Sequence, residues 1–430
     1  MKQAVLLIHG IGEQRPMDTL RSFVESVWTT DETVQRNHPD AAGVWSKPYT
    51  LSQDFELRRL TTAENKAGIR TDFFELYWAH LMGGTKVAHV VSWAVTLLMR
   101  LPSSVPRHLR LAYYTCWMLV LVGIGLTYRF AIAKAAGHTG VPVWVNLVLG
   151  LAVIPLVMSI LLNFVGDAAR YLHVAPPNVG CRSAIRSMGV QVLNSLHERD
   201  YDRIIVVGHS LGSVIGYDIL NFAWNQFNAV EPTKAAPLFD ALGALEDLTV
   251  AHADGAPLDG AQFRAAQRAY FNEFTANGSR WRVTDFVTLG SPLAHAQILL
   301  AHNSADLTAK CDIRELPRCP PTLEASRAAG GIRRFSYPLN APARTPHQAA
   351  VFGPTRWSNL YFPCTALARG DLVGGPLRDI FGAGIRDIAV NTKIWRGFLS
   401  HTHYWTADAR DNSHVLNLRE VLDLIDAHKS

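Results

Sequence analysis

Residues Arg203–Leu220 read RIIVVGHSLGSVIGYDIL, and this stretch decides the fold that we expect. Residues 203–207 are an apolar, β-branched run of the kind that forms a buried strand, and the residues after 212 are compatible with a helix. Between them, residues 208–212 read GHSLG, a G-x-S-x-G sequence. In a strand-turn-helix context, this pattern predicts a strained turn from which the serine hydroxyl projects above the edge of a sheet.

The composition is that of a folded protein with a large core. Of the 430 residues, 48% are apolar and 18% are charged, which argues against disorder. The net charge is +5, and the basic residues are scattered along the chain. We therefore expect no nucleic-acid partner, whereas this charge is compatible with attraction to an anionic membrane surface. The five cysteines are an odd number without metal-ligand spacing. We therefore expect no disulfide framework, no metal and no organic cofactor.

Short apolar strands alternate with helical stretches along most of the chain. This alternation predicts an α/β fold with a mostly parallel sheet and helices on both faces. We expect the catalytic domain to comprise residues 1–85 and 166–430, with residues 221–280 as a candidate cap and residues 294–355 largely irregular. The predicted strands span residues 4–8, 72–77, 203–207, 282–289, 358–362 and 387–390.

An apolar insertion at residues 86–165 separates the two parts of this domain. Residues 111–133 and 141–165 are long and apolar enough to cross a bilayer as a helical hairpin, whereas residues 87–101 are too short. A buried helical pair in a soluble protein is the alternative. Arginines 100, 107, 110 and 170 flank the hairpin, and its turn offers only Lys134 and the borderline Arg129. The positive-inside rule then places both flanking parts in the cytoplasm, at the inner membrane in a bacterium.

With its GHSLG elbow, the chain resembles the serine esterase and lipase-like members of the α/β-hydrolase superfamily. The resemblance implies that Ser210 is the nucleophile and that the Leu211 N–H is one oxyanion-hole donor. The second donor would come from the loop HGIGEQ at residues 9–14, at Ile11 or alternatively at Gly12. The same resemblance implies a cleft lined by His9, Gly10, His209, Ser291 and Pro292, with His209 packed beside the nucleophile rather than serving as a second base.

The order of residues in this superfamily narrows the other catalytic partners, because the acid follows the serine and the histidine follows the acid. Asp371, in the glycine-rich loop ARGDLVGGPL, is the leading acid; Asp379 and Asp387 are less suited. The sequence HTHYW at residues 401–405 resembles an H-x-x-Y-W pattern of similar hydrolases, which selects His401 as the general base and leaves His403 as the alternative.

These features predict a membrane-anchored serine hydrolase that cleaves carboxylic esters through an acyl-enzyme. Lipid acyl esters are favoured because the anchor would hold the cleft near the bilayer, although thioesters or amides would use the same residues. The alternative is a catalytically inactive hydrolase-fold scaffold. Such a scaffold would not need the elbow serine, the second oxyanion loop, the glycine-flanked aspartate and the late histidine in the expected order. A dinucleotide-binding loop fits poorly, since Arg15 stands where G-x-G-x-x-G requires glycine.

Overall fold

The computed structural model describes residues 1–11, 15–37, 43–49, 57–82, 176–228, 239–326, 331–338, 344–364, 370–390, 398–408 and 410–425, with isolated positions between 99 and 172. The predicted membrane helices at residues 111–133 and 141–165 lie outside these ranges, apart from a few isolated positions. Among the residues that are described, no helix has the length and hydrophobicity that crossing a membrane requires.

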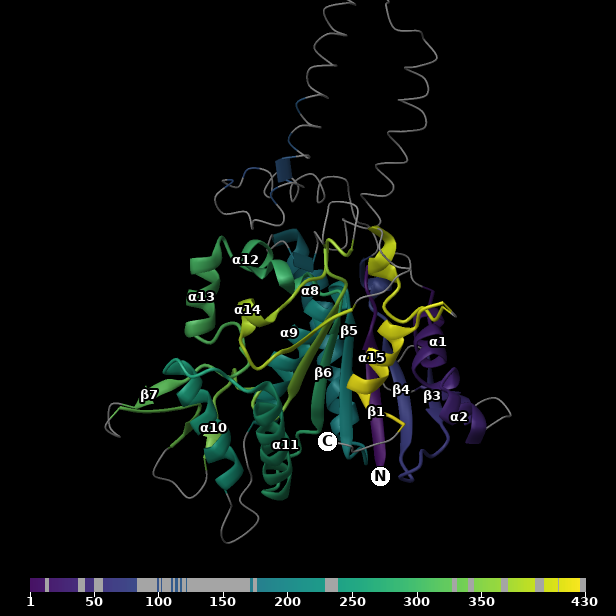
Figure 1. Cartoon of the computed structure of the whole chain (residues 1–430), viewed down its shortest axis with the longest axis horizontal. Helices are drawn as coiled ribbons and strands as arrows, with labels where there is room; N and C mark the ends of the chain where they lie inside the picture. Colours follow the sequence, from purple (N-terminus) through teal and green to yellow (C-terminus); the bar gives the residue numbers. More distant parts are fainter. Residues whose placement is uncertain are drawn as a thin grey trace, which may run out of the picture.

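The fold is built on an eight-stranded sheet in the order β12-β11-β6-β5-β1-β4-β3-β2 (Figure 1). The pairings from β12 to β4 are all parallel, and only β3 runs antiparallel to its neighbours. The protein is therefore an α/β protein with a mostly parallel sheet, as predicted. The strands are β1 (Lys2–Ile8), β2 (Val44–Pro48), β3 (Arg58–Thr62), β4 (Arg70–Leu76), β5 (Arg203–His209), β6 (Val283–Leu289), β11 (Arg356–Tyr361) and β12 (Arg386–Ala389).

The six predicted strands are all present, and their ends differ from the prediction by no more than two residues. The central strands β1 and β5 are apolar along most of their length because strands inside a parallel sheet are buried on both faces. The prediction missed β2 and β3. β2 reads VWSKP and is largely exposed at the sheet edge, while β3 begins with two arginines, so neither shows a continuous apolar run.

The sheet has a topological switch point between β1 and β5. From β1 the chain first builds β2, β3 and β4 on one side, and then crosses to build β5, β6, β11 and β12 on the other. The carboxyl ends of the central strands are level, since Ile8 pairs with both Leu76 and Gly208, and His209 pairs with Leu289. The loops that follow β1, β4, β5 and β6 therefore meet at one edge, where α/β proteins bind ligands.

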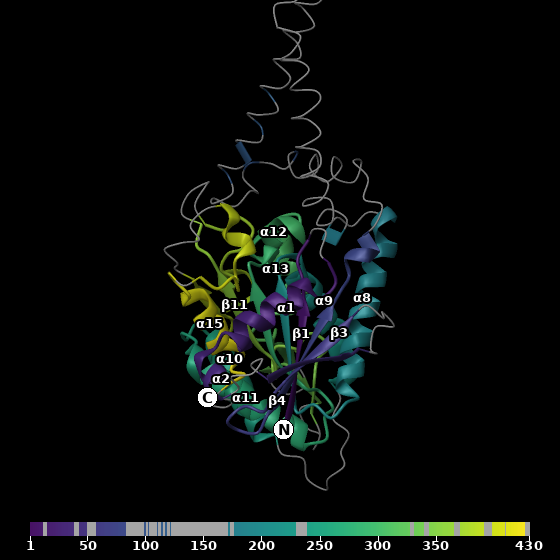
Figure 2. The same cartoon turned by 90° about the vertical axis from the view of Figure 1, so that its right-hand side faces the viewer.

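Helices cover both faces of the sheet, as predicted. Figure 2 shows α8 (Pro176–His197) and α9 (Leu211–Phe227) on one face and α15 (Ser413–Leu422) on the other. α11 (Gly260–Ala276) packs against α9, since the ring of Phe274 lies 5.7 Å from that of Trp224. The other helices are α1 (Asp18–Val24), η1 (Glu25–Thr29), α2 (Glu32–Asn37), η3 (Ala79–Met82), α10 (Asp240–Ala253), η8 (Pro292–His295), α12 (Ala296–Leu299), α13 (Ser304–Asp312), α14 (Arg378–Phe381) and η10 (Phe398–Thr402).

The helices of the candidate cap lie away from the predicted site. A helix is present where AQFRAAQRAYFNEF predicts one, as α11. However, α10 and α11 lie near the amino ends of the strands, opposite the end of β5 that carries Ser210 (Figure 1). A surface hollow there is lined both by α11 and by the first residues of β5 and β11. The described part of residues 221–280 is therefore not a cap over Ser210.

Residues 294–355 contain more regular structure than predicted. They include α12, α13 and four short strands in two antiparallel pairs: β7 (Glu324–Ser326) with β8 (Ile332–Arg334), and β9 (Ser336–Tyr337) with β10 (Thr345–Pro346).

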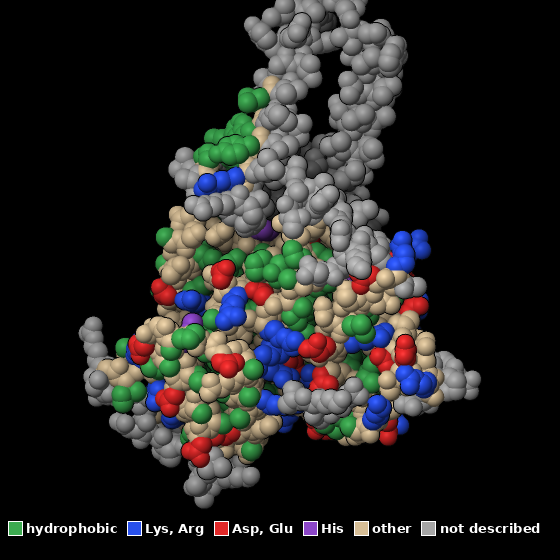
Figure 3. Space-filling view, viewed as in Figure 1, with side chains coloured by type: hydrophobic (Ala, Val, Ile, Leu, Met, Phe, Trp, Pro, Cys, Tyr) green, Lys and Arg blue, Asp and Glu red, His purple; other side chains and the backbone are tan. Residues whose placement is uncertain are grey.

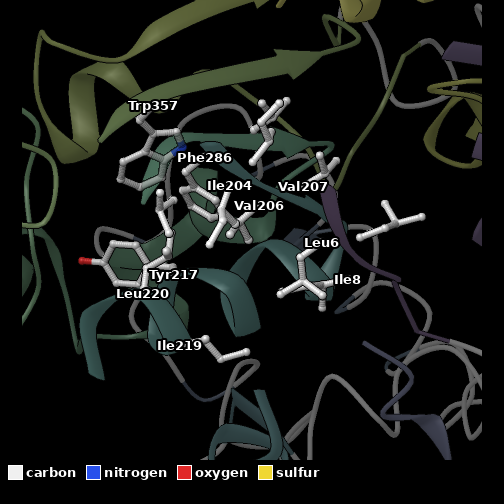
Figure 4. Packing of buried hydrophobic residues seen from close by; sticks show 14 of the residues in the cluster. Leu6, Ile8, Ile204, Val206, Val207, Tyr217, Ile219, Leu220, Phe286 and Trp357 are labelled. Carbon is white, nitrogen blue, oxygen red and sulfur yellow. The ribbon is translucent and has the colours of Figure 1, made fainter. Parts of the chain in front are cut away.

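The core packs α9 against the central strands. Figure 4 shows Tyr217 and Leu220 of α9 close to Ile204, Phe286 and Trp357 of the sheet. The ring of Trp357 lies 5.3 Å from that of Phe286 and 5.6 Å from that of Tyr217. All five side chains are 1% exposed or less, so the start of α9 is held on a rigid platform.

Candidate active site

Ser210 lies in a strained turn between β5 and α9. Its backbone has φ 52° and ψ −128°, a conformation that serine rarely adopts and that costs about 1–3 kcal/mol. The turn is tied at both peptide groups: the Ser210 N–H donates to the Leu289 carbonyl at 2.9 Å, and the Ser213 N–H donates to the Ser210 carbonyl at 2.9 Å. The strand-turn-helix predicted from GHSLG is therefore present.

Two glycines of this sequence are required by close backbone contacts. A Cβ on Gly212 would lie 2.1 Å from the Ile8 carbonyl oxygen, and a Cβ on Gly208 would lie 2.5 Å from the Ser213 Cα atom. No side chain fits at these distances. The first turn of α9 consequently packs directly on the end of β1, which brings the loop after β1 to Ser210.

His401 links the serine to an acid. Its Nε2 atom lies 2.8 Å from Ser210 Oγ, and its Nδ1 atom lies 2.8 Å from Asp371 Oδ2. Since a carboxylate can only accept, Nδ1 carries the proton and Nε2 accepts from the serine hydroxyl. His403, the alternative base, has its Nδ1 atom 3.2 Å from Thr406 Oγ1 instead. The structure thus brings His401 to both partners, in η10.

Asp371 is fully buried and held by several donors. Its Oδ1 accepts from the Val373 N–H at 2.8 Å, and its Oδ2 accepts from the Tyr404 hydroxyl at 2.8 Å as well as from His401. Burial alone would raise the pKa of this carboxyl, but the hydrogen bonds from His401, the main chain at Gly374 and Tyr404 lower it to about 2. The carboxylate therefore stays ionised beside the imidazole.

Tyr404 is a site residue that the sequence analysis missed. Its buried hydroxyl donates to Asp371 and accepts from the Phe362 N–H at 3.2 Å, so it fixes the acid relative to the end of β11. The tyrosine of the HTHYW sequence was the signal that could have identified it. Gly290, with φ +56°, makes room for this contact: a Cβ there would lie 2.5 Å from the Tyr404 ring and 2.8 Å from Asp371.

His209 supports His401 from the other side. Its Nε2–H donates to the His401 carbonyl at 2.9 Å, and its ring lies 5.1 Å from the His401 ring. Burial, with the nearby His401 as a further cause, lowers the pKa of His209 to about 3, so this imidazole is neutral at physiological pH. It packs beside Ser210, as predicted, and its Nε2 atom is engaged with the His401 carbonyl rather than with Ser210 Oγ.

Ser213 and Ser291 brace the elbow. The Ser213 hydroxyl donates to the Ser210 carbonyl at 2.6 Å, so the Ser291 hydroxyl, 2.6 Å from Ser213 Oγ, must donate to it. Ser291 in turn accepts from the Leu293 N–H at 3.2 Å and precedes Pro292, the first residue of η8. Ser291 and Pro292 are fully buried beneath the elbow rather than open to a cleft.

The loop after β1 lies against Ser210. A Cβ on Gly10 would lie 2.9 Å from the Ser210 Cβ atom, so the main chain of Gly10, the residue before Ile11, borders the serine. His9 fixes this loop: it stacks on Trp78 at 5.0 Å, and its carbonyl accepts from Trp78 Nε1–H at 3.0 Å. Leu211, the other predicted donor, is the first residue of α9, where helical N–H groups lack an intrahelical partner. Gly12 lies outside the described residues.

A second buried carboxyl, Glu75, stands at the neighbouring end of β4. Its Oε2 accepts from the Met17 N–H at 2.8 Å, while its Oε1 is buried without a hydrogen-bond partner within the described residues. Burial raises its pKa to about 7, although the Met17 hydrogen bond opposes this. Glu75 is therefore a structural acid with a costly charged form, and it does not contact Ser210.

Within the described part of the chain, no group of three or more histidine, cysteine, aspartate or glutamate side chains is arranged to hold a metal ion. Comparisons with protein-family models, curated proteins and solved structures found no match. The chemistry of the site must therefore be argued from its own residues: a serine hydroxyl, an imidazole at hydrogen-bond distance from it, and an ionised acid behind the imidazole.

Proposed function

We propose that this protein is a membrane-anchored serine hydrolase of the α/β-hydrolase type that cleaves carboxylic esters, with lipid acyl esters favoured. The observation that carries the proposal is the hydrogen-bond chain from Ser210 Oγ through His401 to Asp371, built on a strained turn at the topological switch point. The membrane anchor and the lipid preference rest on the apolar segments at residues 111–133 and 141–165.

In the proposed reaction, Ser210 Oγ attacks the acyl carbonyl carbon while His401 Nε2 takes its proton. Asp371 accepts from Nδ1–H throughout and stabilises the imidazolium that forms. The carbonyl oxygen becomes an oxyanion, which the N–H groups of Leu211 and Ile11 would bind. Such a donor is worth about 10²–10³ in kcat.

The imidazolium then protonates the leaving alcohol, and the acyl group remains on Ser210. Water, deprotonated by His401, attacks this acyl-enzyme and releases the carboxylic acid, which restores the serine hydroxyl. His209 and Tyr404 touch no reacting atom in this scheme. They act as positioning residues, because the first holds the backbone of His401 and the second holds the carboxylate of Asp371.

A fluorophosphonate probe, which reacts covalently with activated serines, tests the proposal in membranes that contain the full chain. We expect the wild type to be labelled and Ser210→Ala to be unlabelled, while Ser22→Ala, which removes an exposed hydroxyl on α1, is labelled like the wild type. Absence of labelling in folded wild type, or equal labelling of Ser210→Ala, would overturn the serine-hydrolase proposal and leave the scaffold alternative.

The two histidines provide an independent test with a short-chain ester as substrate. His401→Ala removes the group that contacts Ser210 and Asp371, whereas His403→Ala removes a contact with Thr406. We expect only the first variant to lose hydrolysis. Inactivity confined to His403→Ala would refute the assignment of the base.

A further inference from the structure

A groove rich in arginine lies at the amino ends of the strands, whereas Ser210 lies at their carboxyl ends. It is a hollow of about 960 Å³ between α11, α15 and the first residues of β11 and β12. Figure 3 shows Lys and Arg side chains gathered near the centre of the face of the molecule that is turned toward the viewer. A smaller hollow of about 360 Å³ continues it, since Arg268 and Arg356 line both. We call this the arginine groove; the arginines that line the larger hollow are Arg264, Arg268, Arg356, Arg378, Arg386 and Arg419.

Acidic side chains offset only part of this charge. The larger hollow is lined by the six arginines and by four acidic residues, so positive charge is in excess. Asp387 is one of these acids, and its carboxylate is occupied by the main-chain N–H groups of Leu377 and Arg378 at 2.8–3.0 Å. The remaining pairings are Arg356 with Asp285 at 2.9 Å, Arg386 with Glu420 at 2.6 Å and Arg419 with Asp31 at 3.1 Å.

Arg264 and Arg378 take part in no ion pair within the described residues. The guanidinium of Arg264, which is half-buried, makes one long hydrogen bond, from Nη1 to the Trp357 carbonyl at 3.5 Å. Burial lowers the pKa of Arg264 to about 10, and the neighbouring Arg356 and Arg386 act in the same direction against the attraction of Asp285. A half-buried cation without a carboxylate partner destabilises the fold unless an anion joins it.

We propose that the arginine groove binds a small ligand that carries phosphate groups. Guanidinium groups present a planar fork of N–H donors that matches phosphate oxygens, and their excess here leaves Arg264 and Arg378 to meet an anion. The volume suits a small molecule. Because the groove lies at the amino ends of the strands, it is a second site, separate from the serine, and does not depend on the proposed hydrolase function.

Calorimetric titration of the purified full chain in neutral detergent tests this site, with inorganic pyrophosphate as the probe for a soluble ligand. Neutral vesicles with and without phosphatidic acid form a second arm, which distinguishes a phosphate headgroup from a free phosphate. We expect binding in at least one arm, weakened by salt. Binding of the wild type in neither arm would overturn the proposal.

Two variants report on the groove and one serves as a control. Arg264→Met and Arg378→Gln should each weaken binding about tenfold or more, since each removes a charge-assisted contact. Arg333→Gln, which removes a charge outside the groove where Arg333 pairs with Asp254, should bind like the wild type. Unchanged binding by both groove variants would refute the site.

Thermal unfolding separates this proposal from a structural role of Arg264. If the arginine is held for a ligand, Arg264→Met without ligand should have a Tm equal to or above that of the wild type, because a desolvated charge is gone. Pyrophosphate or phosphatidic acid, whichever binds, should raise the Tm of the wild type but not of the variant. A lowered Tm of Arg264→Met without ligand would show a structural arginine and overturn the proposal.

Discussion

Replacement of Asp371 by asparagine tests the site in detail, because both carboxylate oxygens accept hydrogen bonds from fixed donors. Oδ1 accepts from the Val373 N–H, and Oδ2 accepts from His401 Nδ1–H and from the Tyr404 hydroxyl, all at 2.8 Å. Asparagine has a single acceptor oxygen, and a main-chain N–H cannot reverse its direction. We therefore expect the asparagine oxygen to keep the Val373 contact and its NH₂ group to face His401 and Tyr404.

An NH₂ group that faces Nδ1 forces the imidazole to carry its proton on Nε2. That nitrogen then donates toward Ser210 Oγ and cannot accept the serine proton. In Ser-His-Asp triads this change of tautomer lowers kcat by about 10⁴. The loss corresponds to about 5 kcal/mol of transition-state stabilisation, and we expect fluorophosphonate labelling of Asp371→Asn to slow by a comparable factor.

Asp387→Asn is the matched control for this variant. Asp387 also has both oxygens engaged as acceptors, by the main-chain N–H groups of Leu377 and Arg378 and by Asn359, rather than by His401. Both variants should unfold at lower urea concentrations than the wild type, and only Asp371→Asn should lose labelling. A loss of less than tenfold in folded Asp371→Asn, or an equal loss in Asp387→Asn, would refute the tautomer argument.

Three further changes have effects that follow from single contacts. The folded-state pKa of Glu75 is raised from 4.5 to about 7, so the contribution of its protonated form to stability is complete below pH 4.5 and is lost as the pH rises to about 7. Glu75→Gln should therefore be more stable than the wild type by up to about 3 kcal/mol at pH 8 and equally stable at pH 4.5. A difference in the free energy of unfolding in urea that does not change with pH would contradict this. Gly212→Ala places a Cβ 2.1 Å from a carbonyl oxygen at the end of β1 and should unfold the elbow. The control Gly243→Ala, which lies in open space on α10, should stabilise the protein by about 0.5–1 kcal/mol in urea unfolding. Similar unfolding midpoints for the two variants would refute the close contact. Tyr404→Phe removes the hydroxyl that donates to Asp371 and should cost about 1.5–3 kcal/mol, which an unchanged Tm would contradict.

Most of the sheet could be predicted from the sequence because its central strands are buried on both faces. Runs such as AVLLI at residues 4–8 and IIVV at residues 204–207 leave no polar position to face solvent, so their burial follows from composition alone. The hairpin of β2 and β3 could not be predicted in this way, since β2 is an exposed edge strand and β3 begins with two arginines. The position of α10 and α11 was also out of reach, because local periodicity says nothing about which end of a sheet a helix covers.

The candidates for the serine, the histidine and the acid of the site could be ranked from the sequence, because their order along the chain and their glycine-rich surroundings leave few alternatives. The structure separates His401 from His403 by which imidazole reaches Ser210, a contact across 191 residues of sequence. The supporting contacts were not predictable for the same reason. Ser213 meets Ser291 across 78 residues, and His209 meets the His401 carbonyl across 192. Their side chains carry no sequence signal that specifies the partner.

The strained serine and its base are positioned by the same short segment. The main chain of Ser210 is tied at both peptide groups, so the fold sets the direction of its Cα–Cβ bond, and the contact with His401 Nε2 at 2.8 Å holds the hydroxyl. The preceding residue, His209, holds the carbonyl of His401, while Ser210 meets the ring of that same histidine. A displacement of the elbow would therefore shift Ser210 and His401 together and preserve their separation. Such coupling explains how a base from a distant loop can be held at hydrogen-bond distance from a turn whose conformation is itself costly.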